Sequence, residues 1–457
     1  MASEAIRKNL ARWFEGGELQ LPSTYLVGGA VRDFLLRRPS NDLDLACRDA
    51  AGLAKRLAGR HAAALVRFEK KPGEACYRVV DRQHPDNFVD LVELFDGDIL
   101  RDLYRRDFTI NAMAMPIRAG GRPGALVDPH NGLSDLNGRT IRMVRPRALT
   151  DDPLRVLRAW RFAAELGCRI DDATRTQLAL HAQKLSSVAA ERIAYELFRV
   201  LAANDAAEWL CDMAELKVLD ILFPEKAGRN ESVSRQQLWH DGLAVLKGVE
   251  TTLKSVRSRY GGAAGQVLEH FRDGNRLPLL KMAALFHDID RAGKGEAERI
   301  AEGIGRRLKL SSRDSVYFTG LLAALEDVFA IAAGSSARSM LVGFFRSSAN
   351  AGVGALVLGD GALAAGGGMA PPGLDRRAGR RRLSQALIDY FSSIRAILAE
   401  KDLIGGTDLI DRGMSPGPVL GKILREVRRA QDEGRVGNRG EALRFAMDLI
   451  AGEAARK

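Results

Sequence analysis

Cysteine is scarce in this sequence of 457 residues, and its four cysteines do not occur as spaced pairs. The short Cys-x-x-Cys intervals of zinc sites and redox motifs are missing, which argues against a disulfide framework or a cysteine-based metal site. Widely separated thiols are typical of reduced proteins, so we expect a cytoplasmic protein. The four residues are Cys47, Cys76, Cys168 and Cys211.

Long apolar runs and an excess of acidic residues are also missing. No run reaches the ~20 residues of a membrane-spanning helix, and "MASEAIRKNLARWFEGG" at the start lacks a signal-peptide core. We therefore expect no membrane partner. The 58 acidic residues are outnumbered by 69 Lys and Arg, and this net charge of +11 favours a polyanionic partner, nucleic acid first. The length predicts two to four domains.

Two patterns of hydrophobicity divide the chain. Residues 24–118 contain short segments rich in β-branched or alternating apolar residues, bounded by turn formers. From about residue 150 onward, apolar residues recur at helical spacings of three and four. The sequence therefore predicts an α+β protein, with a small mixed α/β head followed by an elongated all-α neck, body and tail.

The composition changes again between residues 350 and 382, where Gly, Ala and Pro dominate and five arginines follow. This composition predicts a flexible insertion or linker. The arginines form either a solvated run or a contact with a phosphate backbone, and the sequence favours neither. They are Arg376, Arg377, Arg380, Arg381 and Arg382.

The stretch "NDLDLA" carries the first candidate chemistry. In a strand, Asp42 and Asp44 share one face while the intervening leucines face the core. Two carboxylates about 6–7 Å apart suit a pair of Mg²⁺ ions that stabilise the attacking and leaving oxygens of a displacement at phosphorus. Asp42 and Asp44 are therefore the candidate catalytic and metal-binding residues.

A glycine pair precedes these aspartates. Gly28 and Gly29 end the apolar run "TYLV", and "AVRDFLLRR" then has the pattern of a helix. Backbone N–H groups at such a turn bind phosphate oxygens, and Arg32 adds positive charge. Each signal is weak alone, but together they predict a site for a nucleoside triphosphate and its metal ions.

These residues resemble the first motif of the class II nucleotidyltransferases, the family of CCA-adding tRNA nucleotidyltransferases and bacterial poly(A) polymerases. Further stretches resemble later motifs of that family in the same order, and the tail resembles the C-terminal segment of its longer members. They are "YRRDFTINAMAM" (104–115), "DPHNGLSDLNGRTIR" (128–142), "DDPLRVLRAWRFAAELG" (151–167), "ERIAYELFRVL" (191–201) and the tail at 402–434.

The resemblance implies a domain order. We expect an N-terminal helix (1–22), a catalytic head (23–118), a neck with nucleotide-selecting and RNA-binding helices (119–215), a degenerate HD-like body (216–345), a flexible insertion (346–382) and a helical, tRNA-binding tail (383–457).

The second motif implies contacts to the sugar and triphosphate. Arg106 and Asp107 would read the ribose 2′-hydroxyl, with Arg105 and Asn111 as further nucleotide contacts. Asp107 would equally suit a helix N-cap, and Asn111 could satisfy the backbone. Asp90, on a later strand, is a weaker candidate for a third carboxylate.

The motif at 151–167 implies base selection without a template. Asp152 and Arg155 would hydrogen-bond to the base edge, although Asp152 before Pro153 also fits a plain helix cap. Arg158 and Arg161 would extend a stripe of guanidiniums along the helix. Asp151 stands where the family often has Glu.

The implied activity is Mg²⁺-dependent addition of C, A or both to the 3′ end of tRNA from CTP and ATP, with release of pyrophosphate. Only "DGDILRDL" separates Phe95 from Tyr104. Full CCA-adding members carry a longer loop at this place, so addition of C alone is one possible outcome. Poly(A) polymerase is the alternative within the family, and a catalytically dead RNA-binding protein is another class.

An HD phosphohydrolase is a further class, because "ALFHDIDRAG" resembles the HD signature and His240 stands where an upstream ligand would. His240, His287 and Asp288 could bind one divalent metal. However, Asp290 replaces the usual glycine, and the following stretch contains no histidine. The sequence therefore favours a degenerate HD-like domain.

Overall fold

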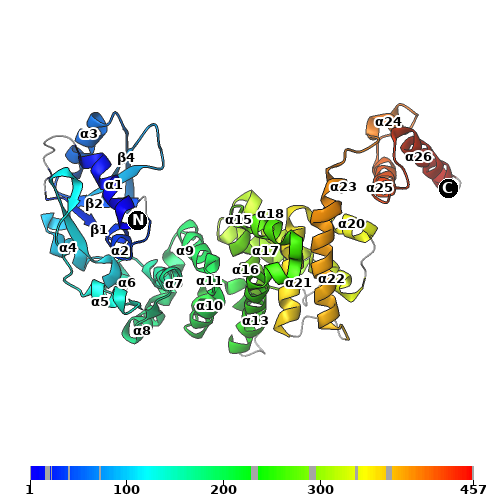
Figure 1. Cartoon of the computed structure of the whole chain (residues 1–457). Helices are drawn as coiled ribbons and strands as arrows, with labels where there is room; N and C mark the ends of the chain where they lie inside the picture. Colours follow the sequence, from blue (N-terminus) through cyan, green and yellow to red (C-terminus); the bar gives the residue numbers. More distant parts are fainter. Residues whose placement is uncertain are drawn as a thin grey trace. The chain divides into compact units, whose positions relative to one another are not determined.

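The computed structural model forms two compact units (Figure 1). The first contains Met1–Glu196 and Leu216–Ile221, and the second contains Leu197–Glu215 and Leu222–Lys457. A mixed α/β head followed by a largely helical remainder confirms the predicted α+β class. The structure describes residues 2–15, 21, 23–39, 42–71, 74–227, 235–287, 295–334, 338–366 and 373–454.

The head is built on a seven-stranded sheet with the strand order β3-β4-β5-β2-β1-β6-β7. Only β2 and β5 pair in parallel, while the other neighbours pair antiparallel. The strands are β1 (Tyr25–Val27), β2 (Asp42–Cys47), β3 (Ala64–Lys71), β4 (Glu74–Val80), β5 (Phe88–Glu93), β6 (Ala114–Arg118) and β7 (Arg122–Pro123).

Helix α3 (Ala50–Arg60) covers one face of β3, β4 and β5 with its buried Leu53 and Leu57. The carboxylate of Glu93 accepts hydrogen bonds from the backbone N–H groups of Asp49 and Ala50, both at 2.8 Å, and so fixes the start of α3 to the end of β5. Helix α3 therefore occupies one face of these strands, and Asp90 of β5 lies on the other face.

Further helices complete the first unit, together with a short parallel pair, β8 (Thr140–Ile141) and β9 (Arg169–Ile170). They are α1 (Ala2–Phe14), α2 (Gly29–Leu35), α4 (Ile99–Tyr104), α5 (Gly132–Asn137), α6 (Ala148–Asp151), α7 (Arg155–Leu166), α8 (Asp172–His181), α11 (Val218–Leu222) and α9 (Ala190–Ala202), the last two of which also reach into the second unit.

The second unit is helical in the part that the structure describes. Its helices are α10 (Ala206–Glu215), α12 (Pro224–Ala227), α13 (Arg235–Lys254), α14 (Val256–Tyr260), α15 (Ala264–Arg272), α16 (Arg276–Leu285), α17 (Glu296–Arg307), α18 (Ser312–Ala323), α19 (Leu325–Ala333), α20 (Arg338–Ser348), α21 (Gly352–Ala365), α22 (Arg376–Asp389), α23 (Arg395–Ala399), α24 (Gly406–Ile410), α25 (Pro418–Asp432) and α26 (Arg439–Ala454).

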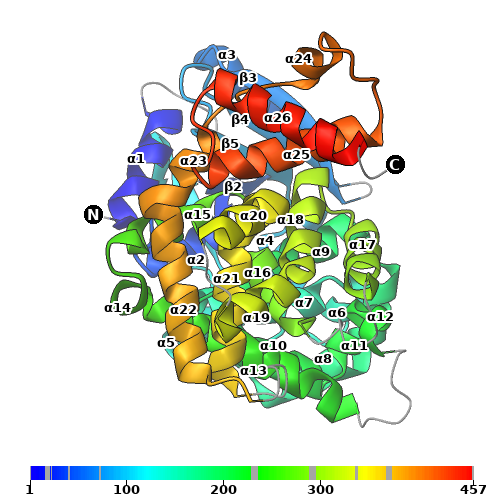
Figure 2. The same ribbon diagram turned by 90° about the vertical axis from the view of Figure 1, so that its right-hand side faces the viewer.

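The predicted flexible insertion (346–382) is wrong for residues 346–365 and 376–382, which are helical, and residues 352–365 form the buried helix α21 at the centre of this unit. Helices α13, α16, α18, α19 and α22 all contact it (Figure 2). At the crossing with α13, a Cβ on Gly248 would lie 2.1 Å from the carbonyl oxygen of Gly361. The small residues therefore permit close helix packing rather than chain flexibility, and residues 367–372 lie outside the described part.

Two of the five clustered arginines point inward, which sequence reasoning did not anticipate. Asp360, fully buried on α21, accepts hydrogen bonds from Arg259 Nε and Arg380 Nε, both at 2.6 Å. Arg382 donates to the carbonyl oxygen of Ala332 at 2.7 Å. Part of the cluster therefore stabilises the helical core, because a buried carboxylate needs charged partners.

Two helical stretches, Ser312–Ala333 and Arg338–Ala365, are long and apolar enough to cross a membrane by length and composition alone. However, 56% and 67% of their most apolar windows are buried within the protein. Each stretch also comprises two separate α-helices, α18 with α19 and α20 with α21. Core helices pass the same test, and we assign both stretches to the core.

We expect Gly361→Ala to lower the free energy of unfolding by about 1–3 kcal/mol, because the new methyl group would overlap α13. Its Cβ would lie 2.7 Å from the backbone nitrogen of Val249. Urea denaturation measures the change. Gly343→Ala in α20 is the control: its Cβ meets nothing within 4 Å, so helix propensity should make it neutral or stabilising. Equal stability of the two variants would contradict the packing.

Candidate active site

Strand β2 positions the candidate catalytic aspartates. Leu43 and Leu45 are buried, whereas Asp44 between them is only half-buried, as the predicted alternation requires. Asp42 begins the strand, opposite Phe88 of β5, and Asp44 pairs in register with Asp90. The alternation therefore puts Asp44 on the face that α3 does not cover.

The glycine turn lies at the end of β1, next to the Asp44 end of β2, since Leu26 pairs with Leu45 antiparallel. Gly28 has a φ of 66°, and a Cβ there would come within 2.8 Å of Arg106 Nη1. Only glycine admits both this conformation and the guanidinium. Arg106 is held by Asp102 at 2.8 Å, so a fixed cation borders the turn.

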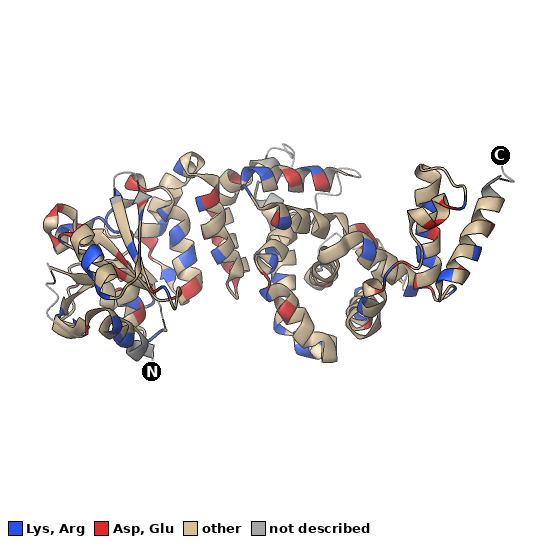
Figure 3. Cartoon of the chain, turned by 90° about the horizontal axis from the view of Figure 1, so that it is seen from above, with Lys and Arg blue, Asp and Glu red and all other residues tan. Residues whose placement is uncertain are grey.

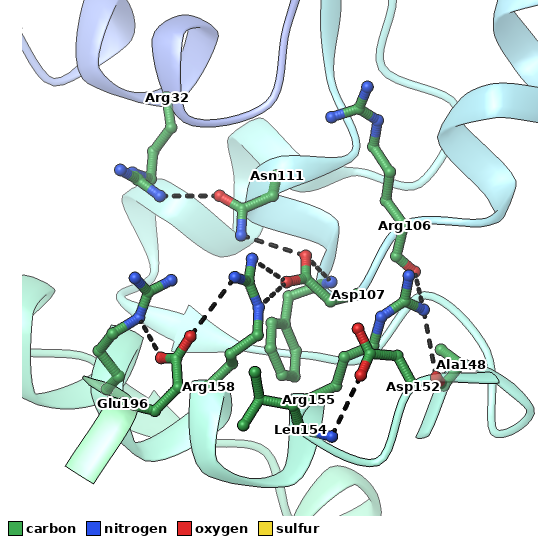
Figure 4. A network of polar contacts seen from close by, with 12 residues as sticks. Arg32, Arg106, Asp107, Asn111, Ala148, Asp152, Leu154, Arg155, Arg158 and Glu196 are labelled. Atoms are coloured by element: carbon green, nitrogen blue, oxygen red, sulfur yellow. Dashed lines mark hydrogen bonds and ion pairs between the residues drawn. The ribbon is translucent and has the colours of Figure 1, made fainter. Parts of the chain in front are cut away.

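Asp107 is the centre of the polar network in Figure 4. This buried carboxylate accepts from Arg158 Nη2 at 2.6 Å and Nε at 2.9 Å. Asn111 donates to it at 3.2 Å and in turn accepts from Arg32 Nη1 at 2.8 Å. Burial alone would raise the pKa of Asp107, but Arg158 and Arg155 outweigh it and hold that pKa well below its usual range.

Glu196 of α9 continues the network. Arg158 Nη1 lies 3.7 Å from Glu196 Oε1, and Arg161 Nε lies 2.9 Å from Oε2. Burial opposes the charge of Arg158, yet the two carboxylates raise its pKa. The predicted guanidinium stripe is therefore paired with protein carboxylates in this structure.

The predicted base-reading pair is also buried. Asp152 lies 3.2 Å from Arg192 Nη2 and accepts weakly from the backbone N–H of Leu154 at 3.3 Å. Helix α7 begins at Arg155, so the expectation that Asp152 caps it directly before Pro153 is wrong by two residues. Asp152 instead follows the last residue of α6.

Arg155 braces the second motif. Its guanidinium donates to the carbonyl oxygens of Arg105 at 2.9 Å and Ala148 at 3.2 Å. Burial lowers the pKa of Arg155. The side chain thus fixes the backbone beside Arg106, and any contact with a base would come in addition to this bracing.

The weaker candidates have partners of their own. Asp151 pairs with Arg145 at 2.6 Å, and the guanidinium of Arg105 lies 3.8 Å from the centroid of the Phe95 ring. Asp90 is held by Arg78 at 2.7 Å. The structure therefore places Asp90 beside Asp44 but in an ion pair rather than as an open third ligand.

The donors on β2 fit magnesium. Carboxylates are the hard oxygen ligands that Mg²⁺ prefers, and Mg²⁺ commonly uses one or two of them together with substrate phosphates. Among the described residues, no group of three or more His, Cys, Asp or Glu side chains is placed to hold a metal. Asp42 and Asp44 would hold such an ion, and oxygens of the triphosphate could supply further ligands.

Each of the two HD-like histidines that the structure describes has a polar neighbour close to it in the sequence. His240 is exposed on α13 and lies 3.3 Å from Asp241, whereas His287 is buried with its Nδ1 3.0 Å from the carbonyl oxygen of Ala284. Asp288 lies outside the described residues. An HD metal site has no support here.

Three residues in contact with the site escaped sequence reasoning. Arg192 and Glu196 stand one helical turn apart on α9 and contact Asp152, Arg158 and Arg161. Their i, i+4 spacing within "ERIAYE" was the available signal. No sequence signal pointed to Arg78, because its pairing with Asp90 depends on the register between strands β4 and β5.

Comparison with protein families gives two matches. Residues 24–142 match the Poly A polymerase head domain, and residues 167–228 match the probable RNA and SrmB-binding site of polymerase A. The first match contains the glycine turn, both β2 aspartates and Asp107.

Two of three similar proteins align with nearly the whole chain. The A-adding tRNA nucleotidyltransferase of Deinococcus radiodurans is 31% identical over 466 residues, covering 93% of this chain and 95% of its own. The CC-adding enzyme of Synechocystis sp. is 29% identical and covers 94% of each chain. The CC-adding enzyme of Geobacter sulfurreducens is 38% identical over 200 residues, 44% of this chain and 45% of its own.

Solved structures share the fold. A CCA-adding enzyme in complex with ATP superposes with a TM-score of 0.67 at 19% identity, covering 98% of this chain and 94% of its own. The Thermotoga maritima CCA-adding enzyme with tRNA gives 0.63 at 20% identity, covering 93% and 91%. With these relatives, the chain belongs to the class II family of CCA-adding tRNA nucleotidyltransferases and poly(A) polymerases, and it is a nucleotidyltransferase of the CCA-adding type.

Proposed function

We propose that this enzyme adds cytidines to the 3′ end of tRNA from CTP, without a template, and stops before the terminal adenosine. The observation that carries the proposal is the segment before Tyr104. Family members that add only C have a shortened loop here, and both CC-adding relatives described above support the same specificity.

That segment is short and folded. A single turn, Phe95–Gly97, leads directly into α4. Asp98 caps α4 by accepting from the backbone N–H of Leu100 at 2.8 Å, and Arg48 donates to the carbonyl oxygen of Gly97 at 2.8 Å. A segment fixed in this way lacks the length and freedom of a loop that would reshape the base pocket for ATP.

The proposed chemistry uses the geometry of the site. The RNA 3′-oxygen attacks the α-phosphorus of CTP, the bond to the β-phosphate oxygen breaks, and pyrophosphate leaves. Mg²⁺ bound at Asp42 and Asp44 would stabilise the charge on the attacking and leaving oxygens. The triphosphate would lie at the Gly28–Gly29 turn near Arg32 and Arg106.

Sugar and base recognition are assigned to the buried network. Asp107 with Asn111 would face the ribose, and Asp152 with Arg155 the cytosine edge, with Arg192 holding Asp152. Lys and Arg residues occur along the helices of both units (Figure 3), in keeping with a polyanionic substrate. We assign tRNA contacts to the neck, body and tail, and a cytoplasmic location to the protein.

Extension of tRNA transcripts tests the specificity directly. A transcript ending before CCA should gain two residues with CTP, and still only two with CTP and ATP together. The reason is that the nucleotide site would not change its preference from CTP to ATP. A transcript ending in CC should gain nothing with ATP. Sequencing gels measure each product. Addition of A would contradict the CC limit, long A-tails would indicate a poly(A) polymerase, and no extension would contradict tRNA nucleotidyl transfer.

Asp44→Asn should reduce the turnover number by about a thousandfold or more, since it removes half of the metal-binding carboxylate pair. Binding of tRNA, measured by filter retention, should be nearly unchanged. Asp86→Asn, an exposed turn residue outside the site, should extend tRNA normally. Extension by Asp44→Asn at the rate of the control would show that the metal assignment is wrong.

Asp152→Asn should reduce the preference for CTP over ATP about 10- to 100-fold, because it replaces an acceptor by a donor at the base edge. The ratio of kcat/KM for the two nucleotides measures this preference, while tRNA affinity should stay constant. An unchanged ratio in a folded variant would place base selection elsewhere.

A further inference from the structure

A line of side chains crosses the open sheet face away from the glycine turn. Asp44 of β2 pairs in register with Asp90 of β5, Asp90 with Arg78 of β4, and Arg78 with Val66 of β3. Val66 is 48% exposed. This line begins at a catalytic carboxylate and ends at the edge strand of the sheet.

Arg78 forms a fixed flat surface within this line. Its Nε and Nη2 donate to the two oxygens of Asp90 at 2.7 and 3.0 Å, a bidentate fork that sets the plane of the guanidinium. The guanidinium carbon lies 4.0 Å from the ring centroid of Phe88 and 5.4 Å from that of Phe68. The Arg78 side chain nevertheless stays 37% exposed, which neutralising Asp90 alone would not require.

In-line transfer places the attacking group opposite the leaving pyrophosphate. The triphosphate is assigned to the Gly28 turn on β1, and β5 and β4 lie on the opposite side of β2. The RNA 3′-terminal nucleotide therefore approaches over Asp90 and Arg78. Proteins commonly bind single-stranded RNA ends by stacking bases on aromatic rings and arginine planes.

We propose that the platform formed by Val66, Arg78 and Phe88 stacks the base of the 3′-terminal nucleotide of the RNA substrate. The proposal rests on the proposed tRNA nucleotidyl transfer. Stacking does not read base edges, so one platform accepts the discriminator base first and cytosine after the first addition. Such tolerance suits an acceptor end whose last base changes at each step.

The test uses tRNA ending before CCA with 2-aminopurine as its last base, bound to the full-length protein without nucleotide. Stacking should quench the fluorescence for the wild type, and Arg78→Ala should abolish the quench. The same variant should raise the KM for tRNA about tenfold while leaving the KM for CTP unchanged. Arg56→Ala on α3, whose side chain is 41% exposed beside Asp49, is the control and should behave as the wild type.

Arg78→Lys keeps the charge beside Asp90 but lacks the fork and the plane, so it guards against misfolding of the alanine variant. We expect it also to lose the quench. Full quenching and an unchanged KM for tRNA in Arg78→Lys would overturn the platform. If the wild type does not extend tRNA, the proposed function is refuted. If the wild type extends tRNA but the Arg78 variants keep its quench and its KM for tRNA, only the platform is refuted.

Discussion

One buried carboxylate connects the parts of the active site. Asp107 receives the Arg158 fork from α7 and Asn111 from its own motif, and Asn111 fixes Arg32 behind the glycine turn. Removing a single partner would leave a buried charge uncompensated, which is costly. The geometry of the Gly28–Gly29 turn and that of helix α7 are therefore coupled through this one side chain, and Glu196 extends the coupling to Arg161.

The parts that sequence predicts well are those governed by local periodicity. The two-residue period of "DLDL" placed Leu43 and Leu45 inside and Asp44 on the open face, because a strand allows no other arrangement once its leucines are buried. The positive φ of Gly28 likewise follows from a turn between a strand and a helix. The order of motifs then supplied the family, and a relative that covers 93% of this chain agrees with it.

Long-range pairing is what the sequence did not reveal. The sequence pointed to Arg155 as a base contact, but it did not reveal that the Arg155 guanidinium also donates to the carbonyl oxygens of Arg105 and Ala148. A Gly- and Ala-rich composition predicted flexibility at 352–365, yet the same small residues let two helices meet at Gly361. In both cases the deciding contact joins elements distant in sequence, and neither composition nor local spacing encodes it.

The fixed segment before Tyr104 has a thermodynamic consequence. A mobile loop loses conformational entropy whenever it closes over a nucleotide, and part of the binding energy offsets that loss. Here the Asp98 cap and the Arg48 contact have already ordered the backbone during folding. The segment before Tyr104 is therefore ordered before the nucleotide binds. The heat capacity change of nucleotide binding should then reflect surface burial, without a contribution from loop folding.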